Sequence, residues 1–220
     1  MSLASFLPIL AALVAYLVGS LSFAVIVSRA MGLSDPRTYG SGNPGATNVL
    51  RSGSKAAAIL TLALDALKGY VPVALVVRFG PAYGMGEGTV ALVALAAFLG
   101  HLWPAFFRFK GGKGVATAGG AVFGIDPLLG AATLATWLII VAFFRYSSLA
   151  SIVAGVFAPF WHVLTDGLDT IALALLVIAG LLIWRHSANI KRLFAGTESR
   201  LGRKASVAGA GAKRGRASRH

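Results

Sequence analysis

Residues suited to binding anions are concentrated in three short segments that separate long apolar stretches. The first runs from Gly40 to Arg51, the second from Phe109 to Thr117 and the third from Arg185 to Arg192. Each segment combines small residues with Lys or Arg. Glycine lets a backbone approach a ligand closely, and Lys and Arg donate charge-assisted hydrogen bonds to phosphate oxygens. The pattern predicts a protein that binds a phosphorylated metabolite or lipid.

The first segment predicts a tight loop, because Asn43-Pro44 is a turn signal and the surrounding glycines permit positive φ. Arg51 can hold a phosphate through two donors. The alternative is an ordinary loop before the next helix, but such a loop needs no comparable density of small polar donors. The segment is not a Walker A loop, since Ala46 stands where that motif requires Lys. The glycines are Gly40, Gly42 and Gly45, and the other hydrogen-bonding side chains are Ser41, Thr47 and Asn48.

The second segment places two lysines around paired glycines just before a predicted helix. Backbone N–H groups, a helix N-terminus and two ammonium groups would then surround one anion. A membrane anchor with a flexible turn is the alternative, but an anchor needs Lys without the glycine frame. The residues concerned are Lys110, Gly111, Gly112, Lys113, Gly114 and Thr117; His101, which precedes them, is expected to be a packing or hydrogen-bonded histidine.

The third segment closes the last predicted helix. His186 and Asn189 are three residues apart and therefore share one helix face, which favours a role in the site. For Glu198, an ion pair that holds the basic tail is at least as favoured as catalysis. In the turn at Arg145, Ser148 can supply one more donor.

The composition is that of a membrane protein, because 57% of the residues are hydrophobic and only 12% are charged. We expect an all-α, multi-pass protein with seven spans, the N-terminus outside and the C-terminus in the cytoplasm. The chain contains no cysteine, which excludes disulfides and thiolate metal sites. The predicted helices cover residues 3–28, 55–78, 89–107, 113–125, 127–144, 148–164 and 169–186.

Charge sets the orientation. With seven spans, all Lys and Arg residues except Lys68 and Arg78 fall on one side, which the positive-inside rule identifies as cytoplasmic. An even number of spans would move the basic C-terminal region outside. The fourth span, 113–125, is short and glycine-rich, which would allow close packing against a neighbouring helix. Asp65 and Lys68, three residues apart, are expected to form a structural pair inside the bundle.

Other classes of site are disfavoured. The net charge of +13 could suggest nucleic acid, but the basic residues flank apolar spans as topogenic charges do. No cluster of acidic residues or histidines on the inner face could hold a divalent metal, and we expect neither a metal nor a cofactor. Residues 203–220 form a basic, low-complexity tail that is expected to be disordered and to contact anionic lipid headgroups at most.

The three segments resemble the bacterial acyl-phosphate-dependent glycerol-3-phosphate acyltransferase family, commonly called PlsY, over residues 1–202. The matching stretches are Gly40 to Arg51, Gly100 to Thr117 and Arg185 to Glu198. The resemblance implies transfer of an acyl group from acyl phosphate to the sn-1 hydroxyl of glycerol 3-phosphate at the cytoplasmic side of the bacterial inner membrane. The products are lysophosphatidate and phosphate. The acyl chain would lie against the apolar bundle, and we expect a monomer.

The same resemblance implies roles for individual residues. Those expected in catalysis are Ser41, Arg51, Lys110, His186 and Asn189, and those expected in substrate binding are Asn43, Gly111, Gly112, Lys113, Gly114, Thr117 and Ser148. Which segment holds which phosphate stays open, and the general base is either His186 or a phosphate oxygen of a substrate. A transporter of phosphorylated metabolites is the alternative function, but it would place its cations near the membrane midplane, often in repeated halves.

Overall fold

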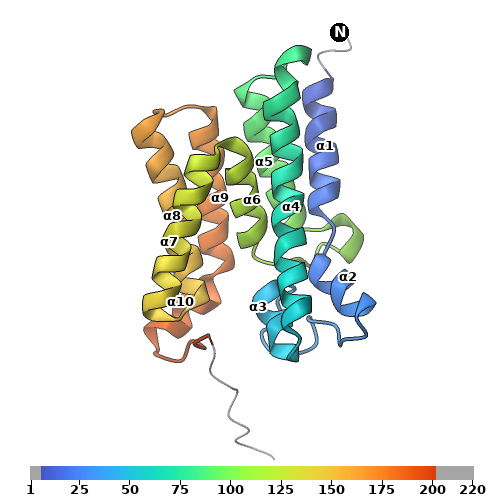
Figure 1. The fold of residues 1–220 in the computed structure, drawn as a ribbon, viewed down its shortest axis with the longest axis vertical. Coiled ribbons are helices and arrows are strands. Elements are labelled where there is room, and N and C mark those ends of the chain that lie inside the picture. Colours follow the sequence, from blue (N-terminus) through green and yellow to red (C-terminus); the bar gives the residue numbers. More distant parts are fainter. Residues whose placement is uncertain (1–5, 202–220) are drawn as a thin grey trace, which may run out of the picture.

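The computed structural model describes residues 6–201, which form helices joined by turns and loops and contain no strand (Figure 1). The predicted all-α class is therefore confirmed, while the tail at 203–220 lies outside the described residues. The helices are α1 (Leu7–Gly19), α2 (Phe23–Ala30), α3 (Ala46–Val49), α4 (Lys55–Phe79), α5 (Glu87–Leu102), α6 (Val115–Ile125), α7 (Pro127–Phe144), α8 (Ser147–Thr165), α9 (Thr170–Arg185) and α10 (Ser187–Phe194).

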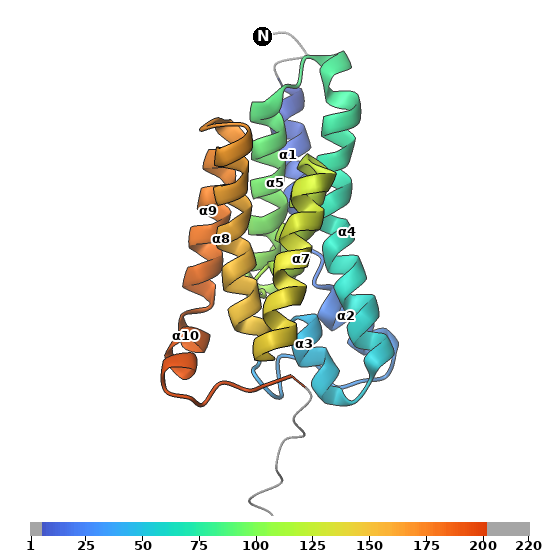
Figure 2. The same cartoon turned by 60° about the vertical axis from the view of Figure 1, so that its left-hand side comes forward.

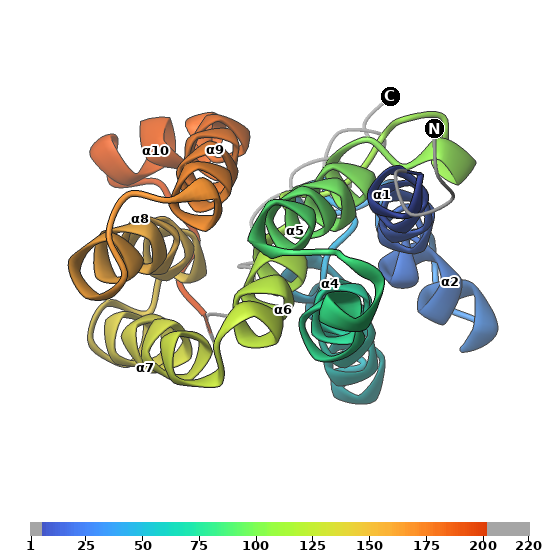
Figure 3. The ribbon, with the colours of Figure 1, turned by 90° about the horizontal axis from the view of Figure 1, so that it is seen from above.

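Helices α5 and α6 connect two groups of helices. Seen from above, α1 and α4 lie on one side and α7, α8 and α9 on the other (Figure 3). α5 contacts α1, α4 and α9, and α6 contacts α4 and α7. The central position of α5 explains why Val93, Ala97 and Phe98 are fully buried.

Within residues 6–201, four helices are each long and apolar enough to cross a membrane: α4, α5, α7 and α8. If each of the bent pairs, α1 with α2 and α9 with α10, forms one span, the number of candidate spans is six. α6 is apolar but has only 11 residues, fewer than the ~17–25 of an ordinary span. The lengths and apolar compositions of these helices thus indicate a multi-pass membrane protein.

The first predicted helix, 3–28, is wrong as a single element, because the chain bends by 42° between α1 and α2. Groups from other helices bind the chain at the break. The ammonium group of Lys68 donates to the carbonyl oxygen of Leu21 at 2.7 Å, and the N–H of Ala105 donates to Oγ of Ser20 at 3.2 Å. The Lys68 bond thus satisfies a backbone carbonyl that would accept an N–H group in a continuous helix, and the Ala105 bond anchors a side chain beside the break.

The predicted helix 89–107 also ends early, at Leu102, because Pro104 disfavours helical geometry at the preceding Trp103. At 1.5 Å per residue, the 16 residues of α5 span about 24 Å and the 25 residues of α4 about 37 Å. The connection from α5 to α6 therefore turns back part-way along the bundle (Figure 1).

The predicted close packing of the glycine-rich helix is confirmed. A Cβ atom built on Gly120 of α6 would lie 1.9 Å from the carbonyl oxygen of Ala66 in α4. Likewise, a Cβ atom on Gly69 of α4 would lie 2.0 Å from the carbonyl oxygen of Thr117 in α6. The two backbones are thus in direct contact, as small residues permit between membrane helices.

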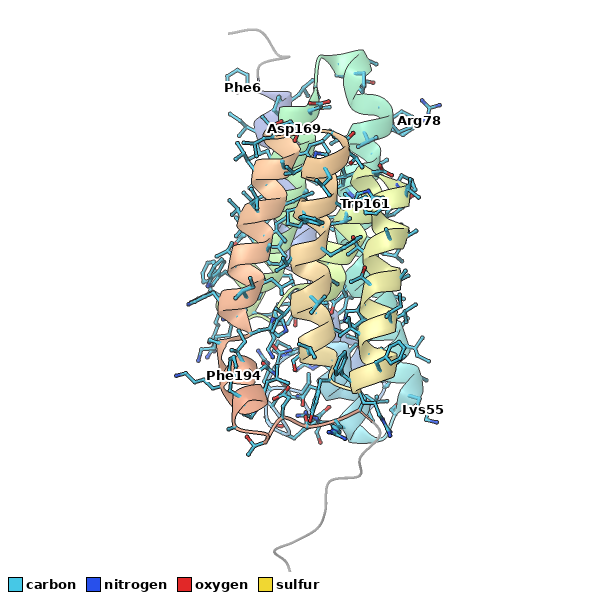
Figure 4. All side chains as sticks on the ribbon, turned by 90° about the vertical axis from the view of Figure 1, so that its left-hand side faces the viewer. Phe6, Lys55, Arg78, Trp161, Asp169 and Phe194 are labelled. Carbon is cyan, nitrogen blue, oxygen red and sulfur yellow. The ribbon has the colours of Figure 1, made fainter. Side chains whose placement is uncertain are left out.

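The two ends of the bundle differ in the residues that they carry. Phe6, Arg78 and Asp169 lie at one end, and Lys55 and Phe194 lie at the other (Figure 4). The second end also receives the turn at Arg145 and the helix that follows Arg185. The arrangement agrees with the predicted gathering of basic segments at one end.

Replacing Gly120 by Ala should destabilise the protein by about 1–3 kcal/mol, because the added methyl group would force α4 and α6 apart. Thermal unfolding in detergent measures the effect. Gly119→Ala is the matched control: no atom outside its own helix backbone lies within 4 Å of the added Cβ, and Ala is the better helix former. Equal melting temperatures for the two variants would contradict the close contact.

Candidate active site

The first polar segment is organised by Asn48, which is buried. Its Nδ2 donates to the carbonyl oxygens of Pro36 at 2.6 Å and Tyr39 at 3.1 Å. Its Oδ1 accepts from the N–H of Ser41 at 3.0 Å and from Nη1 of Arg51 at 3.4 Å. The sequence pattern identified Asn48 only as one hydrogen-bonding side chain among several, whereas it fixes the shape of the whole loop.

Two of the three glycines in this loop adopt the positive φ that the sequence permits, +60° at Gly40 and +66° at Gly42. Gly45 is extended instead, with φ of −155°. The N–H of Asn43 donates to Oγ of Ser41 at 3.5 Å, and the Ser41 residue is exposed. The Ser41 hydroxyl and the Asn43 N–H thus belong to one compact turn before α3, and Arg51, which follows α3, reaches back to this turn through Asn48.

The second segment packs so closely against α5 that its glycines cannot carry side chains. A Cβ atom on Gly111 would lie 2.0 Å from the carbonyl oxygen of His101, and one on Gly112 would lie 2.3 Å from its Nε2 atom. Gly114 caps α6 with φ of +80° and lies against the ring of Phe98. The Gly-Gly-Lys-Gly sequence therefore meets a packing requirement as well as any role in binding.

Arg185, at the end of α9, holds this loop in place. Its Nη2 donates to the carbonyl oxygens of Gly111 and Gly112, each at 2.9 Å, and its Nε donates to Gly112 at 3.1 Å. The N–H of Gly112 donates to the carbonyl oxygen of His101. Sequence reasoning did not assign this role to Arg185, and no local pattern distinguishes an arginine that binds carbonyls from one that binds a ligand.

The third segment supplies a chain of polar contacts around Lys113. The Lys113 ammonium donates to Oδ1 of Asn189, and Nδ2 of Asn189 donates to Oε1 of Glu198 at 2.7 Å. Oγ of Ser148 also donates to Oε1, at 2.8 Å, and Nε of Arg192 pairs with Oε2 at 2.7 Å. Glu198 does form an ion pair, and its partner is Arg192 of α10, while the tail that it was expected to hold lies outside the described residues. The Glu198 side chain is only 6% exposed, and both of its oxygens accept hydrogen bonds.

All three segments meet at one place. Pro44 of the first loop lies against Gly112 of the second, where an added Cβ atom would be 2.9 Å from its carbonyl oxygen. Nη2 of Arg51 donates to Oγ of Ser199 at 2.9 Å. The chain after α10 crosses the end of the bundle toward α3, as Figure 2 shows. Residues far apart in sequence thus form one cationic site.

Burial and like charges perturb two groups of this site: Lys113, which precedes α6, and His186, which lies at the bend between α9 and α10. Desolvation lowers the pKa of Lys113 to about 8, and Glu198 opposes this shift while the nearby arginines add to it. Desolvation, with the charge of Lys113, lowers the pKa of His186 to about 4. His186 is therefore neutral at pH 7. Its Nδ1–H donates to the carbonyl oxygen of Leu182 at 2.8 Å, which leaves Nε2 as an acceptor.

Comparison with known proteins identifies the family to which the chain belongs. The family model described as "Glycerol-3-phosphate acyltransferase" matches residues 9–196. The chain belongs to the glycerol-3-phosphate acyltransferase family. The resemblance on the three polar segments is thus confirmed.

Two relatives named glycerol-3-phosphate acyltransferase show how far the similarity extends. The protein of Cupriavidus metallidurans is 64% identical over 90% of this chain and 98% of its own length. That of Paraburkholderia xenovorans is 63% identical over 88% and 91%. A crystal structure of PlsY (YgiH), an integral membrane glycerol 3-phosphate acyltransferase in its glycerol 3-phosphate form, superposes with a TM-score of 0.83 at 39% identity, covering 89% of this chain and 96% of that one. The lysophosphatidic acid form gives 0.81.

In this acyltransferase, two expected site residues, Lys110 and Thr117, take no part in the hydrogen bonds around Lys113. Lys110 is exposed, and it has no side-chain hydrogen bond or ion pair to another residue within 6–201. Thr117 is fully buried, and its hydroxyl bonds to Nδ1 of His101 at 3.1 Å, behind the loop that carries Lys113. Within the same residues, no group of three or more His, Cys, Asp or Glu side chains is placed to hold a metal ion.

Glu198→Gln should lower the free energy of unfolding at pH 7 by about 2 kcal/mol, because charge-assisted hydrogen bonds from three residues are weakened. Those bonds hold the pKa of Glu198 below its ordinary value even though burial opposes the shift. The carboxylate thus stabilises the fold above about pH 4.5 and loses this effect as the pH falls through the lowered value.

Thermal unfolding of wild type and Glu198→Gln between pH 3 and pH 7 measures this contribution. The difference between the two proteins should shrink at acid pH. Glu87→Gln, an exposed position at the opposite end of the bundle, is the control and should change little. A stability difference that stays constant down to pH 3 would show that the Glu198 charge does not stabilise the fold.

Proposed function

We propose that the protein transfers a fatty acyl group from acyl phosphate to the sn-1 hydroxyl of glycerol 3-phosphate, giving lysophosphatidate and inorganic phosphate. The observation that carries the proposal is the convergence of three distant polar segments on Lys113, in a chain of the glycerol-3-phosphate acyltransferase family. Both substrates are phosphorylated, so a site with several cations suits them. The similarity to a structure titled as a glycerol 3-phosphate form supports the acceptor.

The two phosphates are assigned to two parts of the site. Ser41, Asn43 and Arg51, with Lys110, would hold glycerol 3-phosphate. The backbone of the glycine loop and Lys113 would hold the donor phosphate, and the reverse assignment is the alternative. The N–H groups of Lys113 and Gly114 make no hydrogen bond to another residue within 6–201 and precede the N-terminus of α6, where anions are favoured. The N–H of Gly111 is a further donor of this loop. The expected donors Gly112, Thr117 and Ser148 are engaged within the protein, with His101, His101 and Glu198 respectively, and would act by shaping the site.

The chemistry needs little beyond positioning, because an acyl phosphate is an activated anhydride. The sn-1 oxygen attacks the carbonyl carbon, the bond from that carbon to the phosphate oxygen breaks, and phosphate leaves. Lys113 and Asn189 would stabilise the developing negative charge. His186 has an acceptor Nε2 that can orient the hydroxyl, but a pKa of about 4 makes it a weak base. A phosphate oxygen of the donor is therefore the favoured proton acceptor.

The membrane arrangement follows from charge and packing. We infer seven spans, with α6 as a short crossing held inside the bundle by α4, the N-terminus outside, and the site on the cytoplasmic side of the bacterial inner membrane. The gathering of Lys and Arg at one end supports this orientation. A monomer carries the complete set of site residues. The transporter alternative is not favoured, since the family and the named relatives are acyltransferases.

Purified protein should convert palmitoyl phosphate and glycerol 3-phosphate to lysophosphatidate, with one phosphate released per product. Palmitoyl-CoA tests donor choice and should give no product. Arg51→Met should raise KM for one phosphorylated substrate more than tenfold through loss of a charged contact, while Arg78→Met, at the opposite end (Figure 4), should leave both KM values unchanged. Wild-type protein that is folded but makes no lysophosphatidate would refute the proposed activity.

Topology can be tested directly because the chain has no cysteine, so single cysteines can be introduced without removing native ones. Ser199→Cys should react with an impermeant maleimide only after cells are opened, and Gly84→Cys and Gly167→Cys should react in intact cells. Gly84 lies between α4 and α5, and Gly167 lies between α8 and α9. Labelling of Ser199→Cys and Gly167→Cys from the same side would contradict the proposed topology.

A further inference from the structure

A buried polar network joins α4, α5 and α6, and the proposed chemistry does not use it. Oδ1 of Asp65 lies 2.7 Å from the ammonium of Lys68 and 3.7 Å from Nδ1 of His101. The side chains of Asp65, Lys68 and His101 are 3%, 2% and 7% exposed. Charged groups inside a membrane bundle are costly, and replacing a buried ion pair by apolar residues is often neutral for stability. A network of this kind therefore calls for a functional explanation.

His101 contacts both flanks of Lys113. Its Nδ1 bonds to the hydroxyl of Thr117 at 3.1 Å, in the first turn of α6. Its carbonyl oxygen accepts the N–H of Gly112 at 3.2 Å, and its Nε2 occupies the space that a Gly112 side chain would need. Since Gly112 and Thr117 lie on either side of Lys113 in the chain, one imidazole ring sets the spacing between the loop and the helix that it caps.

Asp65 and Lys68 of α4 orient the His101 ring. The Lys68 ammonium pairs with Asp65 and also donates to the carbonyl oxygen of Leu21, at the break between α1 and α2. The carboxylate faces the Nδ1 edge of His101. The network thus links α4, α5, α6 and the break between α1 and α2 to one edge of the loop.

Resting on the proposed function, we propose that His101, oriented by Asp65 and Lys68, is a positioning residue that fixes the ammonium of Lys113 against the reacting phosphate. It acts through the backbone of the glycine loop and the first turn of α6, without touching substrate. Loss of the outer groups that orient metal ligands costs about 10–100-fold in activity, and we expect an effect of the same order for a group that orients Lys113. The effect should appear in the properties of Lys113 itself.

The kinetic test uses His101→Phe, which keeps a ring and removes both nitrogens, and Asp65→Asn. Each should lower kcat/KM by about 10–100-fold. The double variant should lose little more than His101→Phe alone, because Asp65 acts through His101. Thr61→Val is the matched control: Thr61 is buried in α4 and its hydroxyl has no partner among the described residues. It should keep wild-type kcat/KM, which shows that replacing a buried polar group in α4 is not itself harmful.

The pKa of Lys113 distinguishes a positioning role of His101 from a merely structural one. Its pKa of about 8 reflects burial beside Glu198, Arg192, Arg185 and Arg51. The pKa can be measured without substrate from the pH dependence of modification by an amine-reactive reagent, followed by mass spectrometry. In His101→Phe it should rise toward the ordinary 10.5 as the loop relaxes into solvent. The alkaline limb of kcat/KM, which reports the free enzyme, should rise with it.

The outcomes are distinct. His101→Phe with kcat/KM within twofold of wild type, or a folded variant with an unchanged Lys113 titration, would overturn the proposal. If His101→Phe fails to fold, His101→Gln and Asp65→Asn provide the same two measurements. A wild-type protein without acyltransferase activity whose Lys113 titration still depends on His101 would refute the proposed function while supporting the positioning role. Normal wild-type activity together with a Lys113 titration that does not depend on His101 would support the proposed function and refute the positioning role.

Discussion

The site depends on the early end of α5 at Leu102, which makes the chain turn back inside the bundle instead of at its end. The turn brings the glycine loop against α5, where a side chain at Gly111 or Gly112 would clash with His101. It also removes Lys113 from water, and desolvation is the main cause of its lowered pKa. A short α6 then completes the return, packed backbone to backbone on α4 through Gly69 and Gly120.

Around Lys113 the charges are unbalanced. Besides desolvation, Arg192, Arg185 and Arg51 lower its pKa, and Glu198 raises it. Arg185 is committed to loop carbonyls and Arg192 to Glu198. Within residues 6–201, Lys113 and Arg51, on two different segments, bond only to neutral side chains and form no ion pair with a carboxylate. Two phosphate groups brought side by side would neutralise what the protein alone leaves uncompensated.

Much of this architecture could be predicted from the sequence, because hydrophobic runs and basic flanks encode membrane helices directly. The three polar segments, the Asp65–Lys68 pair and the close packing at Gly120 were all predictable from residue type and spacing. The break at Leu21 was not, because it depends on Lys68, 47 residues away. The role of Arg185 could not be predicted either, since its partners are carbonyl oxygens 73 and 74 residues away. Every residue has a backbone carbonyl, so the sequence does not indicate which carbonyls an arginine will bind.

The lowered pKa of Lys113 couples ligand binding to proton exchange. Near pH 8 about half of the free protein carries a neutral Lys113, whereas a bound phosphate favours the charged ammonium. Anion binding in that range therefore takes up a proton from the medium. The measured heat of binding then depends on the ionisation enthalpy of the buffer, and the apparent affinity weakens as the solution becomes more alkaline, although no contact between protein and ligand has changed.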